Sequence, residues 1–91
     1  MMNDYLTIEN GAVTKCDPNV TNVVIPDGVT SIGVCAFRFH KSLESITIPD
    51  SVTSIGRHAF GFCEDIMIQC NRNSYAEEYA KKNNIPYKIT D

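Results

Sequence analysis

The sequence predicts a mixed α+β fold, a short solenoid of about two and a half 23-residue coils. A β-hairpin is expected at the N-terminal end, and a helix followed by a strand at the C-terminal end. The main observation is that segment 48–63, IPDSVTSIGRHAFGFC, repeats segment 25–40, IPDGVTSIGVCAFRFH, 23 residues later and without a gap. Repeats of this length are typical of solenoids, in which each repeat buries its apolar face against its neighbours. Segments 5–15 and 71–90 have different patterns, which predict the two ends.

Length and composition limit the possible function classes. Ninety-one residues with 43% apolar content fit a single domain, and the net charge of −3 argues against nucleic-acid binding. No apolar run is long enough to span a membrane. The start of the chain lacks the pattern of a signal peptide. We therefore expect a cytoplasmic location for the chain as given, or a secreted or cell-surface location if a leader has been removed.

The N-terminal segment predicts a hairpin. Residues 5–9 alternate apolar and polar, Asn10-Gly11 is a strong turn signal, and 12–15 can return as the partner strand. This hairpin is expected to cover the open end of the solenoid. Residues 1–91 are then one domain, which divides into an N-terminal cap (1–19), repeat 1 (20–42), repeat 2 (43–65), and a partial repeat with a C-terminal cap (66–91).

Each repeat predicts two short strands and a closing turn. In the first strands, alternation directs Val23, Ile25, Ile46 and Ile48 inward. Further inward positions are Val29, Ile32, Val52 and Ile55, followed by the turn residues Ala36, Phe37, Ala59 and Phe60. Gly33 and Gly56 mark sharp bends at which a Cβ atom would be in the way.

The C-terminal segment predicts a helix and a last strand. Ser74 can cap the helix, with Glu77 completing a capping box. The expected apolar stripe is Tyr75, Ala76, Tyr79 and Ala80, and the expected ion pairs are Glu77 with Lys81 and Glu78 with Lys82. Pro86 ends the helix, and a short strand is expected over 87–90.

The repeat pattern LxxIxIPxxVxxIGxxAFxxC resembles the leucine-rich repeat of the bacterial surface-antigen (BspA-like) type. Repeat 2 matches it from Leu43 to Cys63, and repeat 1 matches from Val20 to Phe37 but has His40 in place of the cysteine. The resemblance implies a leucine-rich-repeat fold, a binding role that is often adhesion in secreted members, and no catalytic residues.

Two Cys/His pairs share the 23-residue spacing. Cys35 and His58 form one pair, and His40 and Cys63 form the other, so each pair is expected on adjacent coils. Two cysteines and two histidines would suit zinc, which makes a small metal-binding protein a remote alternative. Packing in the core is the favoured interpretation, because inward-facing residues separate the pairs. We expect no metal ligands and no cofactor.

Two surfaces are candidates for partner binding. Phe39 and Phe62 stack in register beside basic residues and form either an aromatic rim or, as the scarcity of large core residues favours, a second core layer. The outer sheet face is the other candidate, or else a plain solvated surface; it carries Asn22, Val24, Ser45, Thr47 and Met67.

No sequence motif frames a catalytic site, so we expect no enzyme. The favoured function is a non-enzymatic module that binds a protein partner. The alternative is a self-associating structural or surface-adhesion unit, which would be a homo-oligomer.

Overall fold

The computed structural model describes residues 5–63 and 65–91, over which the chain is mixed α+β. Its elements in chain order are β1 (Leu6–Glu9), β2 (Ala12–Cys16), β3 (Asn22–Val24), β4 (Ser31–Ile32), β5 (Ser45–Thr47), β6 (Ser54–Ile55), β7 (Met67–Cys70), α1 (Tyr75–Lys82) and β8 (Tyr87–Ile89).

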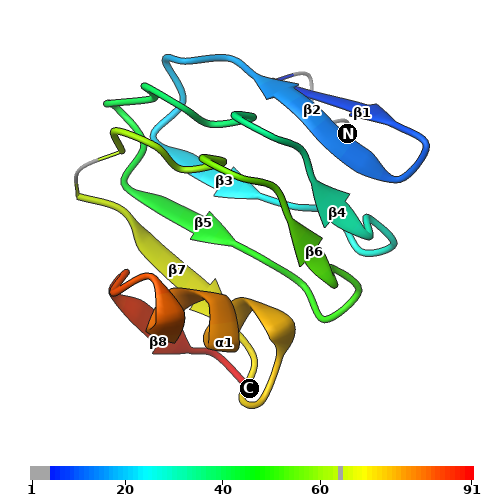
Figure 1. Cartoon of the computed structure of the whole chain (residues 1–91), viewed down its shortest axis with the longest axis vertical. Helices are drawn as coiled ribbons and strands as arrows, with labels where there is room; N and C mark the ends of the chain where they lie inside the picture. Colours follow the sequence, from blue (N-terminus) through cyan, green and yellow to red (C-terminus); the bar gives the residue numbers. More distant parts are fainter. Residues whose placement is uncertain (1–4, 64) are drawn as a thin grey trace.

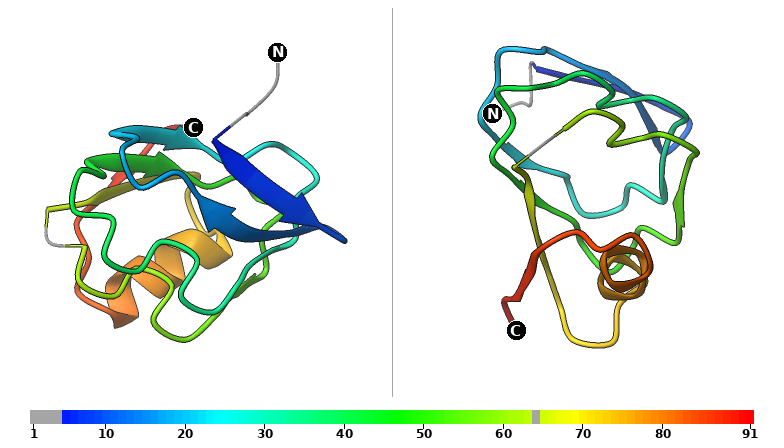
Figure 2. Two further views of the ribbon diagram at one scale, coloured as in Figure 1. Left: turned by 90° about the horizontal axis from the view of Figure 1, so that it is seen from above. Right: turned by 60° about the vertical axis from the view of Figure 1, so that its left-hand side comes forward.

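The strands form two sheets that are almost entirely parallel. One sheet has the order β1-β2-β4-β6 and the other β3-β5-β7-β8, and among the described strands only the β1–β2 pair is antiparallel. The two sheets lie on different sides of the molecule and follow it from the N-terminal to the C-terminal end (Figure 1). The segments after β4 and after β6 form a third side (Figure 2).

The parallel pairing brings equivalent positions of the two repeats side by side. Ser31 pairs with Ser54 and Ile32 with Ile55, as the 23-residue spacing predicts. The next step is one residue shorter, because Ile46 pairs with Ile68. The side chains of β7 therefore alternate inward and outward in step with those of β5, although the 23-residue repeat has ended.

The core lies between the sheets and the third side. The predicted inward residues of both repeats are buried, with one exception. Ile55 is only half-buried, because among the described strands β6 is the last of its sheet and no further strand pairs with it. Phe37 stacks on Phe60 with ring centroids 5.4 Å apart, and Phe60 contacts Tyr79 of α1 at 6.1 Å. These rings join repeat 1, repeat 2 and the helix in one row.

The N-terminal hairpin has the predicted form. Asn10 and Gly11 have φ values of 52° and 79°, which a tight two-residue turn requires and which Asn and Gly accept readily. β2 continues into the sheet by pairing with β4. Beside β3, the Val24 N–H donates to the Tyr5 hydroxyl at 3.3 Å. The hairpin is thus fixed to both sheets.

Gly56 is required by a close approach rather than by an unusual backbone conformation. A Cβ atom there would lie 2.5 Å from the Val34 backbone nitrogen and 2.8 Å from the Gly33 carbonyl carbon. Real side chains do not tolerate such distances to backbone atoms, which cannot move aside. The expectation of an obstructed Cβ is therefore confirmed at Gly56, and the obstruction is the preceding repeat.

The helix α1 differs from its prediction in three details. Ser74 caps it by accepting from the Glu77 N–H, but the Glu77 carboxylate reaches back to the Asn73 N–H at 2.6 Å instead of the Ser74 N–H. Within the described part of the chain, Glu77 pairs with Lys81 at 3.6 Å and the expected pair of Glu78 with its lysine does not form.

The third detail concerns the apolar stripe of α1. The two alanines of the stripe are buried, but Tyr75 is exposed because it lies in the first turn, at the margin of the core. The ring of Tyr75 contacts only Tyr79, at a centroid distance of 6.5 Å, among the aromatic neighbours described.

Replacing Phe60 with alanine should lower the free energy of unfolding by about 3–5 kcal/mol, because it empties the middle of the aromatic row. Urea denaturation measures this change. The matched control is Phe62→Ala, two residues further on, where the side chain is 59% exposed and the loss should be about 1 kcal/mol or less. Equal losses in the two variants would contradict the buried position of Phe60.

Candidate functional site

The third side of the molecule is built by two equivalent segments, 33–40 and 56–63, which we call repeat turn 1 and repeat turn 2. Three N–H groups of repeat turn 1 donate to carbonyl groups of repeat turn 2. The bonds run from Cys35 to Arg57 at 3.1 Å, from Phe37 to Ala59 at 2.8 Å, and from Phe39 to Gly61 at 2.8 Å. This ladder holds the side chains of the two turns in register.

Both repeat turns contain residues in the left-handed backbone region. Cys35 and His58 have φ values of 60° and 59°, and Phe39 and Phe62 have values of 66° and 60°. A left-handed conformation costs about 1–2 kcal/mol for a residue other than glycine, and it is rare for large side chains. The equal values in the two turns show that their backbones have the same shape.

Phe39, Phe62 and Arg38 form an exposed group that we call the aromatic patch. The two rings stack with centroids 4.7 Å apart and planes within 7° of parallel. The Arg38 guanidinium lies over both rings, 4.8 Å from the centroid of Phe39 and 5.4 Å from that of Phe62. Such a cation–π contact keeps the charge in water while it orders the aromatic surface.

The aromatic patch corrects one expectation. Phe39 and Phe62 do not form a second core layer, because their side chains are 55% and 59% exposed. Their left-handed backbone turns them away from the interior, whereas Phe37 and Phe60, two residues earlier, point into it. The sequence pattern could not separate these two outcomes, since both place aromatic residues in register.

Gly61, the residue equivalent to Arg38 in the second repeat, leaves space for the Arg38 side chain. A Cβ atom at Gly61 would lie 3.3 Å from Cγ of Arg38, so the bare glycine leaves room for the arginine side chain. The sequence analysis noted Arg38 only as a neighbour. The signal that identifies its role is the change from arginine to glycine at one repeat position.

The second candidate surface is the outer face of the β3-β5-β7-β8 sheet. Register pairing joins Asn22, Ser45 and Met67 in one row, and Val24 and Thr47 in the next. The Ser45 hydroxyl donates to the Asn22 side chain at 2.7 Å, and Val24 is 55% exposed. Pairing also adds Gln69 and Lys88 to the second row, which the sequence analysis did not include.

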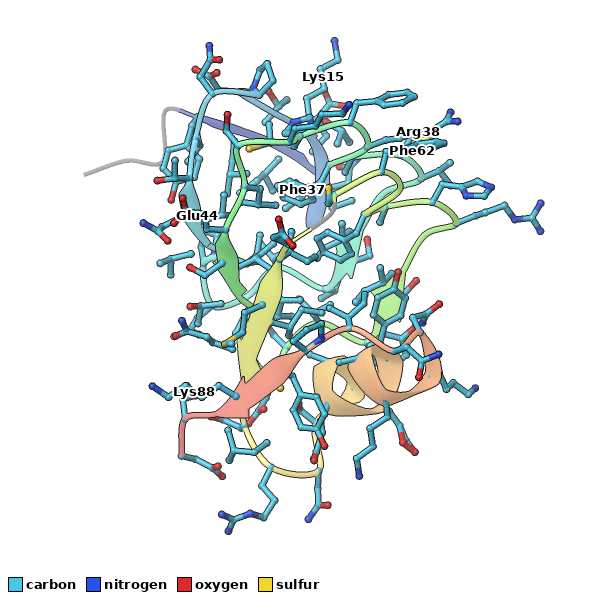
Figure 3. The ribbon with its side chains drawn as sticks, turned by 90° about the vertical axis from the view of Figure 1, so that its left-hand side faces the viewer. Lys15, Phe37, Arg38, Glu44, Phe62 and Lys88 are labelled. Atoms are coloured by element: carbon cyan, nitrogen blue, oxygen red, sulfur yellow. The ribbon has the colours of Figure 1, made fainter. Side chains whose placement is uncertain are left out.

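The two candidate surfaces face different directions. In Figure 3, Lys88 of the sheet lies on one side, Arg38 and Phe62 project from the other, and Phe37 lies between them. A small partner contact would therefore cover one surface or the other, and the two can be tested by separate substitutions.

Of the two Cys/His pairs, His40 and Cys63 bond to the backbone, whereas Cys35 is half-buried and His58 is exposed. The two ring nitrogens of His40 lie 2.9 Å from the Arg38 carbonyl oxygen and 2.8 Å from that of Cys16. The Cys63 thiol donates to the Phe37 carbonyl at 2.9 Å. Within residues 5–63 and 65–91, no three His, Cys, Asp or Glu side chains gather as metal ligands would. His40 instead ties repeat turn 1 to the end of β2.

Three thiols are protected from ionisation by their surroundings. Burial raises the pKa of Cys16 to about 11, and the nearby Asp17 carboxylate adds to this. Burial also raises the pKa of Cys63 and that of Cys70. Thiolates are the reactive form of cysteine, so these three residues are suited to packing and not to nucleophilic chemistry.

Parallel strands in repeat register, closed by matching turns, define the class of repeat proteins. The model of the BspA type leucine rich repeat region (6 copies) matches residues 6–88. The chain therefore belongs to the BspA-type leucine-rich-repeat family, as the resemblance indicated. Comparisons with curated proteins and with solved structures found no match.

The family is one of non-enzymatic repeat proteins, and leucine-rich-repeat domains commonly mediate protein interactions. In the part of the chain that the structure describes, no helix has the length and apolar character needed to cross a membrane.

Raising the pH should destabilise the fold through Cys16. The folded-state pKa of about 11 lies above the ordinary value of 9.0, so the unfolded chain loses the thiol proton first. Stability from this group is complete below about pH 9 and is lost as the pH rises through about 11. Urea unfolding at pH 8, 9, 10 and 11 measures the decline.

Cys16→Ala provides the control for this pH dependence. Its decline between pH 9 and pH 11 should be shallower than that of the wild type, although Cys63 and Cys70 retain part of it. Identical slopes for the two proteins would show that the Cys16 thiol does not contribute.

Proposed function

We propose that this chain is a non-enzymatic module that binds a protein partner, and that the aromatic patch is its principal contact. One observation carries the proposal: two stacked, solvent-exposed phenylalanines lie under an arginine, in a backbone conformation that disfavours large residues. Aromatic residues, phenylalanine among them, and arginine are enriched at protein interfaces relative to the rest of the surface.

Backbone strain supports a binding role for Phe39 and Phe62. Outside the two repeat turns, the left-handed non-glycine positions of the described chain are occupied by Asn10, Asn73 and Asn84, which accept that conformation more easily. Within the turns, Cys35 and His58 share the strained conformation with the two phenylalanines. An exposed phenylalanine gives little to the core in return for its strain. Strained residues without a structural benefit are typical of functional sites.

The sheet face is a weaker candidate within the same proposal. Its predicted contacts, Asn22, Val24, Ser45, Thr47 and Met67, are small or flexible, and two are only half-exposed. Strands of three or four residues offer an area well below that of a standard interface of about 800 Å² per partner. A contact here would be weak by itself.

Self-association is the second candidate function, because both sheets end in strands with an unpaired edge. In the second sheet, β3 and β8 each pair with one neighbour among the described strands. Such edges can pair with another copy and build a structural or adhesive assembly. Tyr5 beside β3 and exposed Lys88 in β8 act against this pairing.

We further propose the domain organisation that the sequence predicts. Residues 20–42 and 43–65 would be two coils of one short solenoid, with 66–91 supplying a partial third coil. The hairpin and the helix-plus-strand segment would act as its caps. The parallel ladders between repeats and the pairing of β2 with β4 support this organisation.

Replacing Phe39 and Phe62 together with asparagine should weaken partner binding without destabilising the fold. Asparagine tolerates the left-handed conformation, so the melting temperature should stay the same or rise. Loss of two central aromatic contacts should weaken binding at least tenfold. Affinity capture from lysate of the source organism, followed by titration of the captured partner, measures the effect.

The comparison variant is Ser45→Glu with Thr47→Lys, which alters only the outer sheet face. It should bind like the wild type. Loss of binding in this variant with retention in the double-asparagine variant would move the site from the aromatic patch to the sheet.

Light scattering at increasing concentration separates the two candidate functions. A binding module should remain monomeric up to millimolar concentration, because its edge strands are short and Tyr5 and Lys88 oppose pairing with another copy. The backbone groups of Pro86 and Thr90 bond to β7, so by alternation the N–H of Ile89 faces the open edge of β8. A scattering mass that rises with concentration, and that falls when Ile89→Pro removes this donor, would favour self-association.

A further inference from the structure

The ring of Phe62 is the last member of a stack that the repeats build. Phe39 covers one face of this ring, with the centroids 4.7 Å apart and the planes within 7° of parallel. Among the described residues, no third repeat turn follows to cover the other face, and the Phe62 side chain is 59% exposed. The stack therefore ends in a ring face that is open to a further planar group.

The surroundings of repeat turn 2 leave this ring accessible. A groove of about 400 Å³ lies between repeat turn 2 and the end of α1, and it is lined by Gly61 and Cys63 but not by Phe62. The Phe62 ring thus stands outside the groove, and it projects from the same side of the molecule as Arg38 (Figure 3). A partner can therefore reach the ring without displacing the helix.

Arg38 supplies the charge at the two rings. Its guanidinium lies 4.8 Å from the centroid of Phe39 and 5.4 Å from that of Phe62, and no carboxylate of the described residues lies within salt-bridge distance of it. A guanidinium that rests on an aromatic ring can still donate two parallel N–H bonds, in its own plane, to a carboxylate. Exposed Lys41 follows repeat turn 1 and exposed Asp65 follows repeat turn 2, so the flanks of the patch carry both signs. The charge that selects a partner is therefore that of Arg38 itself.

A second copy of this chain is a poor partner for the patch. Two copies that met patch to patch would bring two Arg38 guanidinium groups together, and juxtaposed like charges disfavour association. A partner with a carboxylate at the same place would pair with the guanidinium instead. Charge complementarity therefore favours a different protein, with an acidic group beside an apolar planar one.

We propose that the partner presents an aromatic side chain with a carboxylate close to it. The aromatic ring stacks on the open face of Phe62, as Phe62 stacks on Phe39, and the carboxylate accepts hydrogen bonds from Arg38. A third ring gains stacking contact at a position that the repeat register has already ordered. This inference rests on the proposed function of the aromatic patch and names the chemistry that the patch recognises.

NMR titration with three blocked heptapeptides tests the proposal. The first has a central tryptophan, an aspartate two positions to either side, and glycine elsewhere. The second has asparagine in place of aspartate, and the third has leucine in place of tryptophan. The first should bind at millimolar concentration and shift the ring protons of Phe62 through the ring current of the tryptophan. The other two should each bind roughly threefold more weakly, because each lacks one of the two contacts.

Arg38→Met tests the carboxylate contact separately. Methionine keeps an unbranched apolar side chain beside the rings and removes the guanidinium, so this variant should bind the aspartate and asparagine peptides equally. Arg57→Met is the matched control, because it removes the same charge from repeat turn 2 at a position without a cation–π contact among the described residues. It should keep the preference of the wild type for aspartate.

Two results would overturn the pairing of the carboxylate with Arg38. One is equal binding of the aspartate and asparagine peptides by the wild type, and the other is loss of the preference in Arg57→Met as in Arg38→Met. No binding of the first peptide, or shifts confined to residues outside the aromatic patch, would overturn the inference as a whole. The capture experiment judges the proposed function separately, since a captured partner that Phe39→Asn with Phe62→Asn releases upholds the patch as a protein-binding site.

Vesicles of phosphatidylcholine and phosphatidylserine provide the last arm of the test. The chain should stay in solution when the vesicles are sedimented. Cosedimentation that Phe39→Asn with Phe62→Asn abolishes, without binding of the first peptide, would assign the patch to an anionic membrane surface and overturn both the inference and the proposed function.

Discussion

The stacking of one repeat on the next, in strict register, is the interaction on which the rest of the structure depends. A parallel ladder aligns equivalent residues, so Phe37 meets Phe60 inside the molecule and Phe39 meets Phe62 outside it. The same alignment requires glycine at position 56, where the backbone of the preceding repeat leaves no space for a Cβ atom. The register between the repeats therefore accounts for the packing of the core, the stacked rings on the surface and the need for glycine at position 56.

The aromatic patch is a surface consequence of that register. Stacking two rings at a separation of 4.7 Å requires neighbouring turns of identical shape, which the backbone ladder provides. The arginine that covers them needs a small residue one repeat later, and Gly61 supplies it. The exposed group of two rings and a guanidinium thus depends on a difference between the repeats at one position, arginine in the first and glycine in the second.

The C-terminal end of the stack differs from its interior, because no further repeat is stacked on repeat 2. Its apolar side chains and backbone groups must therefore be covered or bonded in another way. The sheet ladder of repeat 2 is continued on one side by β7 and β8, and the core is covered by α1. Repeat turn 2 has no such continuation among the described residues, where the N–H groups of His58, Phe60 and Phe62 donate to no backbone acceptor. Helical coverage shields apolar side chains from water but does not offer carbonyl groups in ladder spacing.

Much of the fold was determined by the sequence alone, because local patterns carry it. The 23-residue repeat predicted the parallel stacking, Asn10-Gly11 the hairpin, and Ser74 the helix start, all of which the structure bears out. Tertiary structure decided the exposure of Phe39 and Phe62 and the partial exposure of Ile55 and Tyr75. Spacing shows which residues align, but burial depends on the backbone dihedral angles and on what covers the last strand, and both arise only once the chain has packed.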